Sequence, residues 1–309
     1  MAVAPVSFRA YTADFDGFAR DLGASFERYG FAVLADHDLD PALIARAAAA
    51  AKAFFALPEA AKLAYKIPGG GGQRGYTPFG VETAKGAEHF DLKEFWHAGR
   101  DLPAGHPYRA AMPGNVWPEE IADFHAAVGG LYDALDRLGN RVLRGIARHL
   151  GLADDYFEAP TAFGNSILRL LHYPPAPFDG PNVRAGAHED INAITLLLGA
   201  EEAGLELKDR DGRWLAIDPP AGAVVCNIGD MLQRLTNHRL PSTTHRVVNP
   251  APERRGMARY SMPFFLHFAP DFEIRTLPGC ASPEQPDRYP EPIMAQAYLD
   301  ERLREIKLT

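Results

Sequence analysis

The chain has 309 residues, of which 47% are hydrophobic and 23% are charged, so it can bury a large core in one elaborate domain or in two. Its formal net charge of −8, with no basic stripe, argues against a nucleic-acid partner. Its two cysteines, Cys226 and Cys280, are far apart, which argues against a disulfide framework and fits a reducing cytoplasm. Because no long apolar run or leader-like start occurs, we expect a cytoplasmic protein that does not span a membrane.

The first third of the chain is predicted to alternate helices with a short strand. Apolar residues at helical spacing predict a helix over residues 14–29, which a glycine ends, and a strand follows over 31–34. An aspartate followed by proline begins an alanine-rich helix over 40–57. Residues 68–118, rich in glycine, proline and aromatic side chains, are predicted to form a long ordered loop with little regular structure that covers a functional site.

The pattern then changes to short strands. A helical period of apolar residues over 118–150 predicts one long helix, and a last helix is predicted over 291–306. Many short strands between these two helices favour a sandwich or jelly roll over a parallel α/β sheet. The predicted fold class is therefore mainly β with flanking helices. The predicted strands are 166–173, 193–198, 205–207, 214–217, 223–227, 244–248 and 259–267.

Three side chains in the strand-rich part have the chemistry of metal ligands. His188 and Asp190 are two residues apart at the start of a predicted strand region, so both side chains project to the same side of an extended segment. His245 can join them if a second strand folds back alongside the first. Two imidazoles and one carboxylate on one face of an ion leave its other face open, which is typical of non-haem Fe(II) oxygenases.

Several separated motifs resemble the isopenicillin N synthase-like family of Fe(II)/2-oxoglutarate oxygenases. They are the HxD motif with its distant histidine, the Arg-x-Ser at 259–261, Tyr173 before two prolines, and the N-terminal stretch YGFAVLADHDLD. They occur in the family's order over roughly residues 10–270. The resemblance implies a double-stranded β-helix core of the jelly-roll, cupin-like type, with Fe(II) as cofactor and with 2-oxoglutarate and O2 as cosubstrates.

The resemblance also implies a role for each matched residue. The HxD motif and the distant histidine would bind the iron. Arg259 and Ser261 would bind the distal carboxylate of 2-oxoglutarate, and Tyr173 would be a further contact, although packing beside the prolines explains Tyr173 equally well. The arginines at 254–255 compete for the anchoring role. Because Arg259 and Ser261 are two apart on one strand face, whereas 254–255 lie in a proline-rich turn, we favour Arg259.

Two other motifs are interpreted as structural. A second HxD occurs at 89–91, with His97 nearby, but it has no distant histidine or Arg-x-Ser to match it. Residues 70–75 satisfy GxGxxG, yet no strand precedes them and no helix follows, so a flexible glycine-rich loop is favoured over a dinucleotide site.

The run that follows this loop resembles the part of the family that lines the substrate pocket. On that basis Arg74, Tyr76 and Glu82 are candidate substrate contacts, and ordinary loop packing explains them equally well. Their mixture of charge and aromatic surface suits an amino acid, a peptide or a secondary metabolite.

The sequence divides into three predicted parts: an N-terminal helical and mixed region over 1–118, a helix plus catalytic β-core over 119–270, and a C-terminal extension with a helix over 271–309. The resemblance implies an oxygenase that hydroxylates or desaturates a small molecule with release of succinate and CO2. Ethylene-forming breakdown of 2-oxoglutarate, suggested by residues 75–76 and 82–83, is one alternative. A non-catalytic jelly-roll binding protein is another. No obligatory protein partner is expected.

Overall fold

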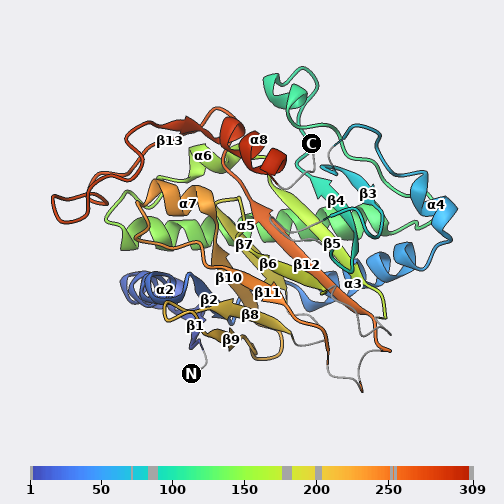
Figure 1. Cartoon of the computed structure of the whole chain (residues 1–309), viewed down its shortest axis with the longest axis horizontal. Coiled ribbons are helices and arrows are strands. Elements are labelled where there is room, and N and C mark those ends of the chain that lie inside the picture. The colour runs from blue at the N-terminus through green and yellow to red at the C-terminus, as the bar shows by residue number, and fades with distance from the viewer. Residues whose placement is uncertain are drawn as a thin grey trace.

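The computed structural model describes residues 3–70, 72–82, 90–175, 183–198, 204–250, 253 and 256–305. In this part of the chain, strands from both halves form two sheets that face each other (Figure 1). Apolar side chains of β2, β7, β8 and β10 pack into one layer between the sheets, which is the arrangement of a jelly roll.

The larger sheet has the strand order β1-β2-β10-β7-β12-β5-β4-β3, and its pairings are antiparallel except for that of β1 with β2. Because helices cover its other face, its central strands are buried on both sides. Its strands are β1 (Pro5–Ser7), β2 (Phe31–Ala35), β3 (Gly75–Thr77), β4 (Glu94–Gly99), β5 (Ile167–Tyr173), β7 (Ile194–Leu198), β10 (Val224–Ile228) and β12 (Arg259–Leu266).

The smaller sheet has the order β6-β11-β8-β9 and is antiparallel throughout. Its strands are β6 (Ala185–His188), β8 (Leu205–Lys208), β9 (Trp214–Ala216) and β11 (His245–Val247). A separate two-stranded ladder pairs β13 (Glu273–Ile274) with β14 (Ile293–Met294).

Helices α2 and α3 both pack against α5, and α5 runs across the outer face of the large sheet (Figure 1). Gly139 lets α5 approach the sheet closely, since a Cβ atom there would lie 2.9 Å from a side-chain carbon of Leu196. None of the helices in the described ranges is long and apolar enough to cross a bilayer. The helices are α1 (Arg9–Ala13), α2 (Phe15–Tyr29), α3 (Pro41–Phe55), α4 (Glu59–Leu63), η1 (Pro107–Ala110), α5 (Phe124–His149), α6 (Glu158–Ala162), α7 (Asp230–Leu235) and α8 (Ala295–Glu305).

The predicted N-cap of α3 and the predicted glycine stop of α2 are confirmed, and the structure adds a cap at the start of α2. The side chain of Asp14 accepts a hydrogen bond from the backbone of α2, and Asp40 does the same for α3. Gly30 ends α2 with φ of +68°, a left-handed conformation that favours glycine. These ends are local in sequence, and this is why the pattern of residues located them.

Other predictions need correction. The long helix α5 begins at Phe124, six residues after the predicted start, and α8 begins at Ala295 because residues 293–294 form β14. Residues 68–118 contain more regular structure than predicted, since β3 and β4 extend the edge of the large sheet. His188 ends β6 instead of lying at the start of the next strand.

Candidate metal centre and its cavities

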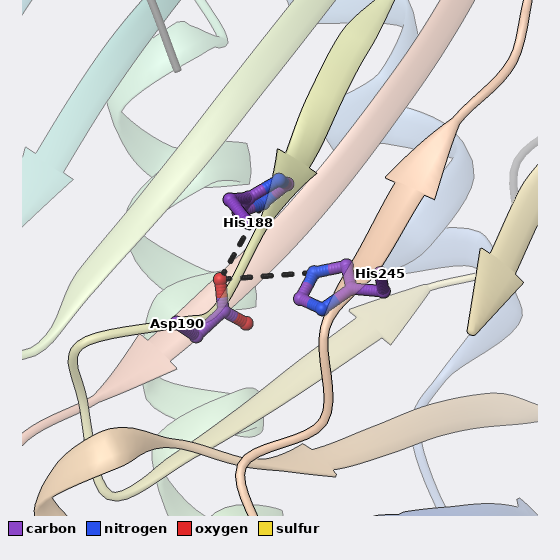
Figure 2. A group of neighbouring side chains, drawn as sticks. All are labelled: His188, Asp190 and His245. Carbon is purple, nitrogen blue, oxygen red and sulfur yellow. Dashed lines mark ion pairs between the residues drawn. The ribbon is translucent and has the colours of Figure 1, made fainter. Parts of the chain in front are cut away.

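The structure brings His188, Asp190 and His245 together, as Figure 2 shows. His188 at the end of β6 is the register partner of His245 at the start of β11, and their ring centroids lie 4.4 Å apart. The Nε2 atoms of His188 and His245 lie 3.8 and 3.9 Å from the same oxygen, Oδ1 of Asp190. The three potential ligand atoms are all within 4.8 Å of one another, so one ion can contact them all.

The tautomers of both imidazoles suit metal binding. Nδ1 of His188 lies 2.7 Å from the carbonyl oxygen of Gly186, and Nδ1 of His245 lies 3.1 Å from that of Thr243. A carbonyl only accepts, so Nδ1 carries the proton in each ring. The unprotonated Nε2 of each ring then faces Asp190 with a free lone pair, as a metal ligand requires.

The carboxylate of Asp190 is held from the side away from the histidines. Its Oδ2 accepts hydrogen bonds from the amide of Asn227 at 2.7 Å and the hydroxyl of Thr195 at 2.5 Å. Thr195 in turn accepts from the amide of Asn192 at 2.8 Å, which directs its proton toward Asp190. These bonds fix the carboxylate and leave Oδ1 directed at the two imidazoles.

The ionisation states of His188 and Asp190 also suit metal binding. Desolvation inside the fold, and then the neighbouring His245 ring, lower the pKa of His188 to about 4. Burial alone would raise the pKa of Asp190, but the two imidazoles and its hydrogen bonds keep it below its usual value. A neutral His188 imidazole and an ionised Asp190 carboxylate are therefore available at neutral pH beside His245, and this donor set fits Fe(II).

Removing the hydroxyl that holds Asp190 should weaken metal binding without unfolding the protein. We expect Thr195→Val to lower the affinity for Fe(II) by about 10–100-fold, because outer-shell hydrogen bonds orient the ligands of a metal. Competition with a chromophoric chelator measures the affinity. Thr195→Ser keeps the hydroxyl and is the matched control; equal loss in both variants would show that the methyl packing, not the hydrogen bond, matters.

A small cavity of about 70 Å³ lies between the sheets and reaches all three residues of the triad. Arg259, Ser261 and Tyr173 also line it, and all three are buried. Arg259 begins β12 and is the register partner of Tyr173 on β5, with its guanidinium carbon 5.0 Å from the centroid of the tyrosine ring. A cation in a narrow, largely apolar cavity suits a compact carboxylate ligand. The competing arginines at 254–255 lie outside the described residues.

A large cavity of about 400 Å³ opens on the other side of the triad and contains His188 and Asp190 in its wall. Helix α8 of the C-terminal part contributes Leu299, Arg302 and Leu303 to this wall. The volume is within the range of pockets that hold small molecules.

Strand alternation divides β5 and β12 between the two cavities. On each strand every second residue faces the interior. Along β5 and the residue pair before it, the large cavity is lined by Asn165, Ile167 and Arg169, and the small cavity by Arg169, Leu171 and Tyr173. Along β12 and the residue after it, Arg259, Ser261 and Pro263 line the small cavity, Phe265 lines both, and His267 lines the large one.

The three predicted substrate contacts do not lie together. Glu82 lines the large cavity, whereas Arg74 and Tyr76 line neither cavity. The hydroxyl of Tyr76 donates a hydrogen bond to the carboxylate of Glu94, and the Arg74 guanidinium lies against Gly99, where a side chain would clash with it. The structure thus places Arg74 and Tyr76 in the packing behind the pocket wall.

The second HxD motif has a structural role where it is described. His89 of this motif lies outside the described residues, and so does Gly71 of the GxGxxG stretch. Asp91 accepts from the backbone of Gly186 at 3.0 Å and pairs with Lys93 at 2.9 Å, which ties the loop to the metal-binding strand. Within the described ranges, the triad is the one group with metal-ligand spacing.

Sequence reasoning missed several residues of the cavity walls. Alternate residues of a strand share a face, so counting backward in steps of two from Tyr173 would have reached some of them. The same rule placed Arg259 and Ser261 on one face. The missed residues are Lys93, His97, Asn165, Ile167, Arg169, Phe265 and His267.

The chain matches known families over most of its length. A model described as the 2OG-Fe(II) oxygenase superfamily matches residues 164–268, and one described as non-haem dioxygenase in morphine synthesis N-terminal matches residues 5–120. The chain is 35% identical over 277 residues to the 2-oxoglutarate-Fe(II) type oxidoreductase hxnY of Emericella nidulans, which covers 86% of this chain and 78% of the relative. The chain belongs to the 2OG-Fe(II) oxygenase superfamily.

Solved structures of similar proteins have the same fold. A 2OG-Fe(II) oxygenase family protein from Caulobacter crescentus has a TM-score of 0.93 at 64% identity, covering 99% of both chains. A full-length Neurospora crassa protein, solved in complex with alpha-KG and thymine, has a TM-score of 0.87 at 28% identity, covering 98% of this chain and 96% of that one. The predicted family, jelly-roll fold, enzyme class and use of Fe(II) and 2-oxoglutarate are thereby confirmed.

Proposed function

We propose that this oxygenase hydroxylates or desaturates a small molecule, with release of succinate and CO2, and that His188, Asp190 and His245 hold its iron. The observation that carries the proposal is that two cavities of different character meet at this triad. The small one contains a buried cation, Arg259, and the large one has room for a separate organic substrate.

Each residue at the centre has a task in this proposal. Fe(II), when bound, supplies the chemistry that couples the oxidation of 2-oxoglutarate by O2 to that of the substrate. Arg259 and Ser261 bind the distal carboxylate of 2-oxoglutarate, while Tyr173 packs against the arginine and limits its movement. The apolar walls between the sheets keep water away from the bound cosubstrate.

A small-molecule substrate is supported by the relatives and by the size of the large cavity. The structure of the Neurospora crassa relative contains thymine beside alpha-KG, and thymine is a small molecule. We also propose a cytoplasmic location without an obligatory protein partner, supported by the two free, buried cysteines.

We propose that the chain divides into residues 1–118, 119–270 and 271–309, and that each part contributes residues to the metal centre or to the wall of the large cavity. The first part supplies the loop that carries Glu82, the second supplies the triad, and the third supplies α8 to the wall of the large cavity.

The test uses the purified protein loaded with Fe(II) without oxygen. Adding 2-oxoglutarate should produce a weak visible charge-transfer band, and admitting oxygen with a panel of small molecules should release succinate faster for at least one of them. Ethylene in the head space would favour the alternative breakdown of 2-oxoglutarate. A protein that shows no band and no turnover would instead support the non-catalytic alternative.

A further inference from the structure

Arg169 occupies the boundary between the two cavities. It lies at the middle of β5 and is one of five residues that line both cavities, together with Lys93, Phe265, His188 and Asp190. A side chain at this position is close to whatever occupies either cavity beside the triad.

The guanidinium of Arg169 is fixed on three sides. Its Nη1 donates to the carboxylate oxygens of Glu82 at 3.1 and 3.3 Å, and its Nε donates to Nε2 of His97 at 2.6 Å. Its carbon Cζ lies 4.2 Å from the ring centroid of Phe95 and 5.3 Å from that of Phe265, within range of cation–π attraction. Such a side chain is oriented before any ligand arrives.

His97 is neutral and therefore a suitable neighbour for this cation. Its Nδ1 lies 2.5 Å from the carbonyl oxygen of Gly72, so the ring proton is on Nδ1 and Nε2 accepts from Arg169. Burial, followed by the charge of Arg169, lowers the pKa of His97 well below its usual value. Sheet register also fixes the pair, since His97 on β4 is opposite Arg169 on β5.

The second terminal nitrogen of Arg169, Nη2, has no hydrogen-bond partner among the described residues. The charges around it are otherwise matched. Glu82 pairs with both Arg169 and Lys93, and Asp91 pairs with Lys93 at 2.9 Å. The Arg169 side chain is 14% exposed and lines both cavities, so this nitrogen can donate a charge-assisted hydrogen bond to a ligand oxygen that enters them.

We propose that Nη2 of Arg169 donates to a carbonyl or carboxylate oxygen of the primary substrate and so determines which substrates bind. This inference rests on the proposed function. Since Arg169 shares both cavities with His188 and Asp190, the oxidised carbon lies near the group that carries this oxygen. Ile167 and Phe265 give the rest of the substrate an apolar surface. Glu82 and His97 are positioning residues that act through Arg169.

Two ligands could supply the acceptor oxygen, because the carboxylate of 2-oxoglutarate nearest the metal also lies by the triad. The primary substrate is favoured because Asn165 and Ile167, which come before Arg169 along the same face, line the large cavity alone. The experiment therefore measures the two ligands separately.

The test compares wild type with Arg169→Gln, each loaded with Fe(II) without oxygen, and uses the visible band as a binding signal. Thymine, L-proline and benzoate carry a carbonyl or carboxylate, and indole and pyrrolidine carry neither. At least one of the first three should perturb the band of the wild-type complex with 2-oxoglutarate. Its affinity should fall at least about tenfold in Arg169→Gln, the usual size of a lost bond to a charged group. The affinity for 2-oxoglutarate should change by less than about threefold.

Several outcomes would overturn the proposal: unchanged probe affinity in the variant, wild-type binding limited to the carbonyl-free probes, or no probe binding at all. A large loss of 2-oxoglutarate affinity would assign the acceptor oxygen to the cosubstrate instead. Arg169→Lys keeps the charge beside Glu82 but loses the planar fork, so it should also weaken probe binding and serves if the glutamine variant does not fold. If the wild type gives the band with 2-oxoglutarate but substitution of Arg169 does not change the affinity for any probe, the proposed function stands and only this inference is removed.

Discussion

Replacing His245 with alanine should abolish the iron centre while leaving the fold in place. We expect the Fe(II) affinity of His245→Ala to fall by more than about 100-fold, because loss of a ligand exceeds the 10–100-fold effect of losing an outer-shell partner. The visible band with 2-oxoglutarate should disappear, and succinate release should disappear with it. Iron analysis after gel filtration, together with the band, measures both effects.

His125→Ala is the matched control, since His125 is an exposed histidine stacked on Trp117 and belongs to neither cavity. It should retain iron and turnover. If His245→Ala binds iron as the wild type does, the three side chains in Figure 2 are not the ligand set. The melting temperature of both variants, measured without metal, separates loss of the ligand from loss of the fold.

Replacing Arg259 with glutamine should act on the cosubstrate and leave the metal. Removing one partner of a buried charge pair costs about 2–5 kcal/mol, so the dissociation constant of 2-oxoglutarate should rise by about 30-fold or more. The Fe(II) affinity should stay within about threefold of wild type, because the hydrogen bonds that hold Asp190 come from Asn227 and Thr195. Anaerobic titration of the visible band with 2-oxoglutarate gives the dissociation constant.

Arg246→Gln provides the comparison for this variant. Arg246 lies on β11 in the smaller sheet, pairs with Glu206 at 2.7 Å and lines neither cavity. Its loss should leave the titration unchanged. Should Arg255→Ala raise the dissociation constant while Arg259→Gln does not, the distal carboxylate is anchored from the proline-rich turn and the assignment of Arg259 is wrong.

Effects on cosubstrate binding and on primary-substrate binding should be separable, because the small and the large cavity lie at different ends of the same strands. The register of β5 with β12 places Tyr173 opposite Arg259 and Ile167 opposite Phe265. One strand pair therefore carries the proposed anchor for 2-oxoglutarate at one end and the wall of the large cavity at the other. Arg169 lies between them. Because Asn165 and Ile167 on the same face line the large cavity alone, we expect variants of Arg169 to affect the primary substrate more than the cosubstrate.

Local signals in the sequence were enough for the end of α2, the start of α3 and the chemistry of the centre. Gly30 and Asp40 act on backbone within a few residues, so their roles at helix ends follow from the residue types. The spacing of Arg259 and Ser261 gave their shared face, because the strand period is two wherever the strand lies. The types and spacing of His188, Asp190 and His245 gave a ligand set, although the strand that ends at His188 was missed.

The tertiary structure alone decided which distant segments meet. The pairing of β6 with β11 brings His188 to His245, and the pairing of β4 with β5 brings His97 to Arg169. It also placed Arg74 and Tyr76 behind the wall and Glu82 in the cavity. Register between strands far apart in sequence depends on the packing of whole sheets, and no short pattern of residues encodes it.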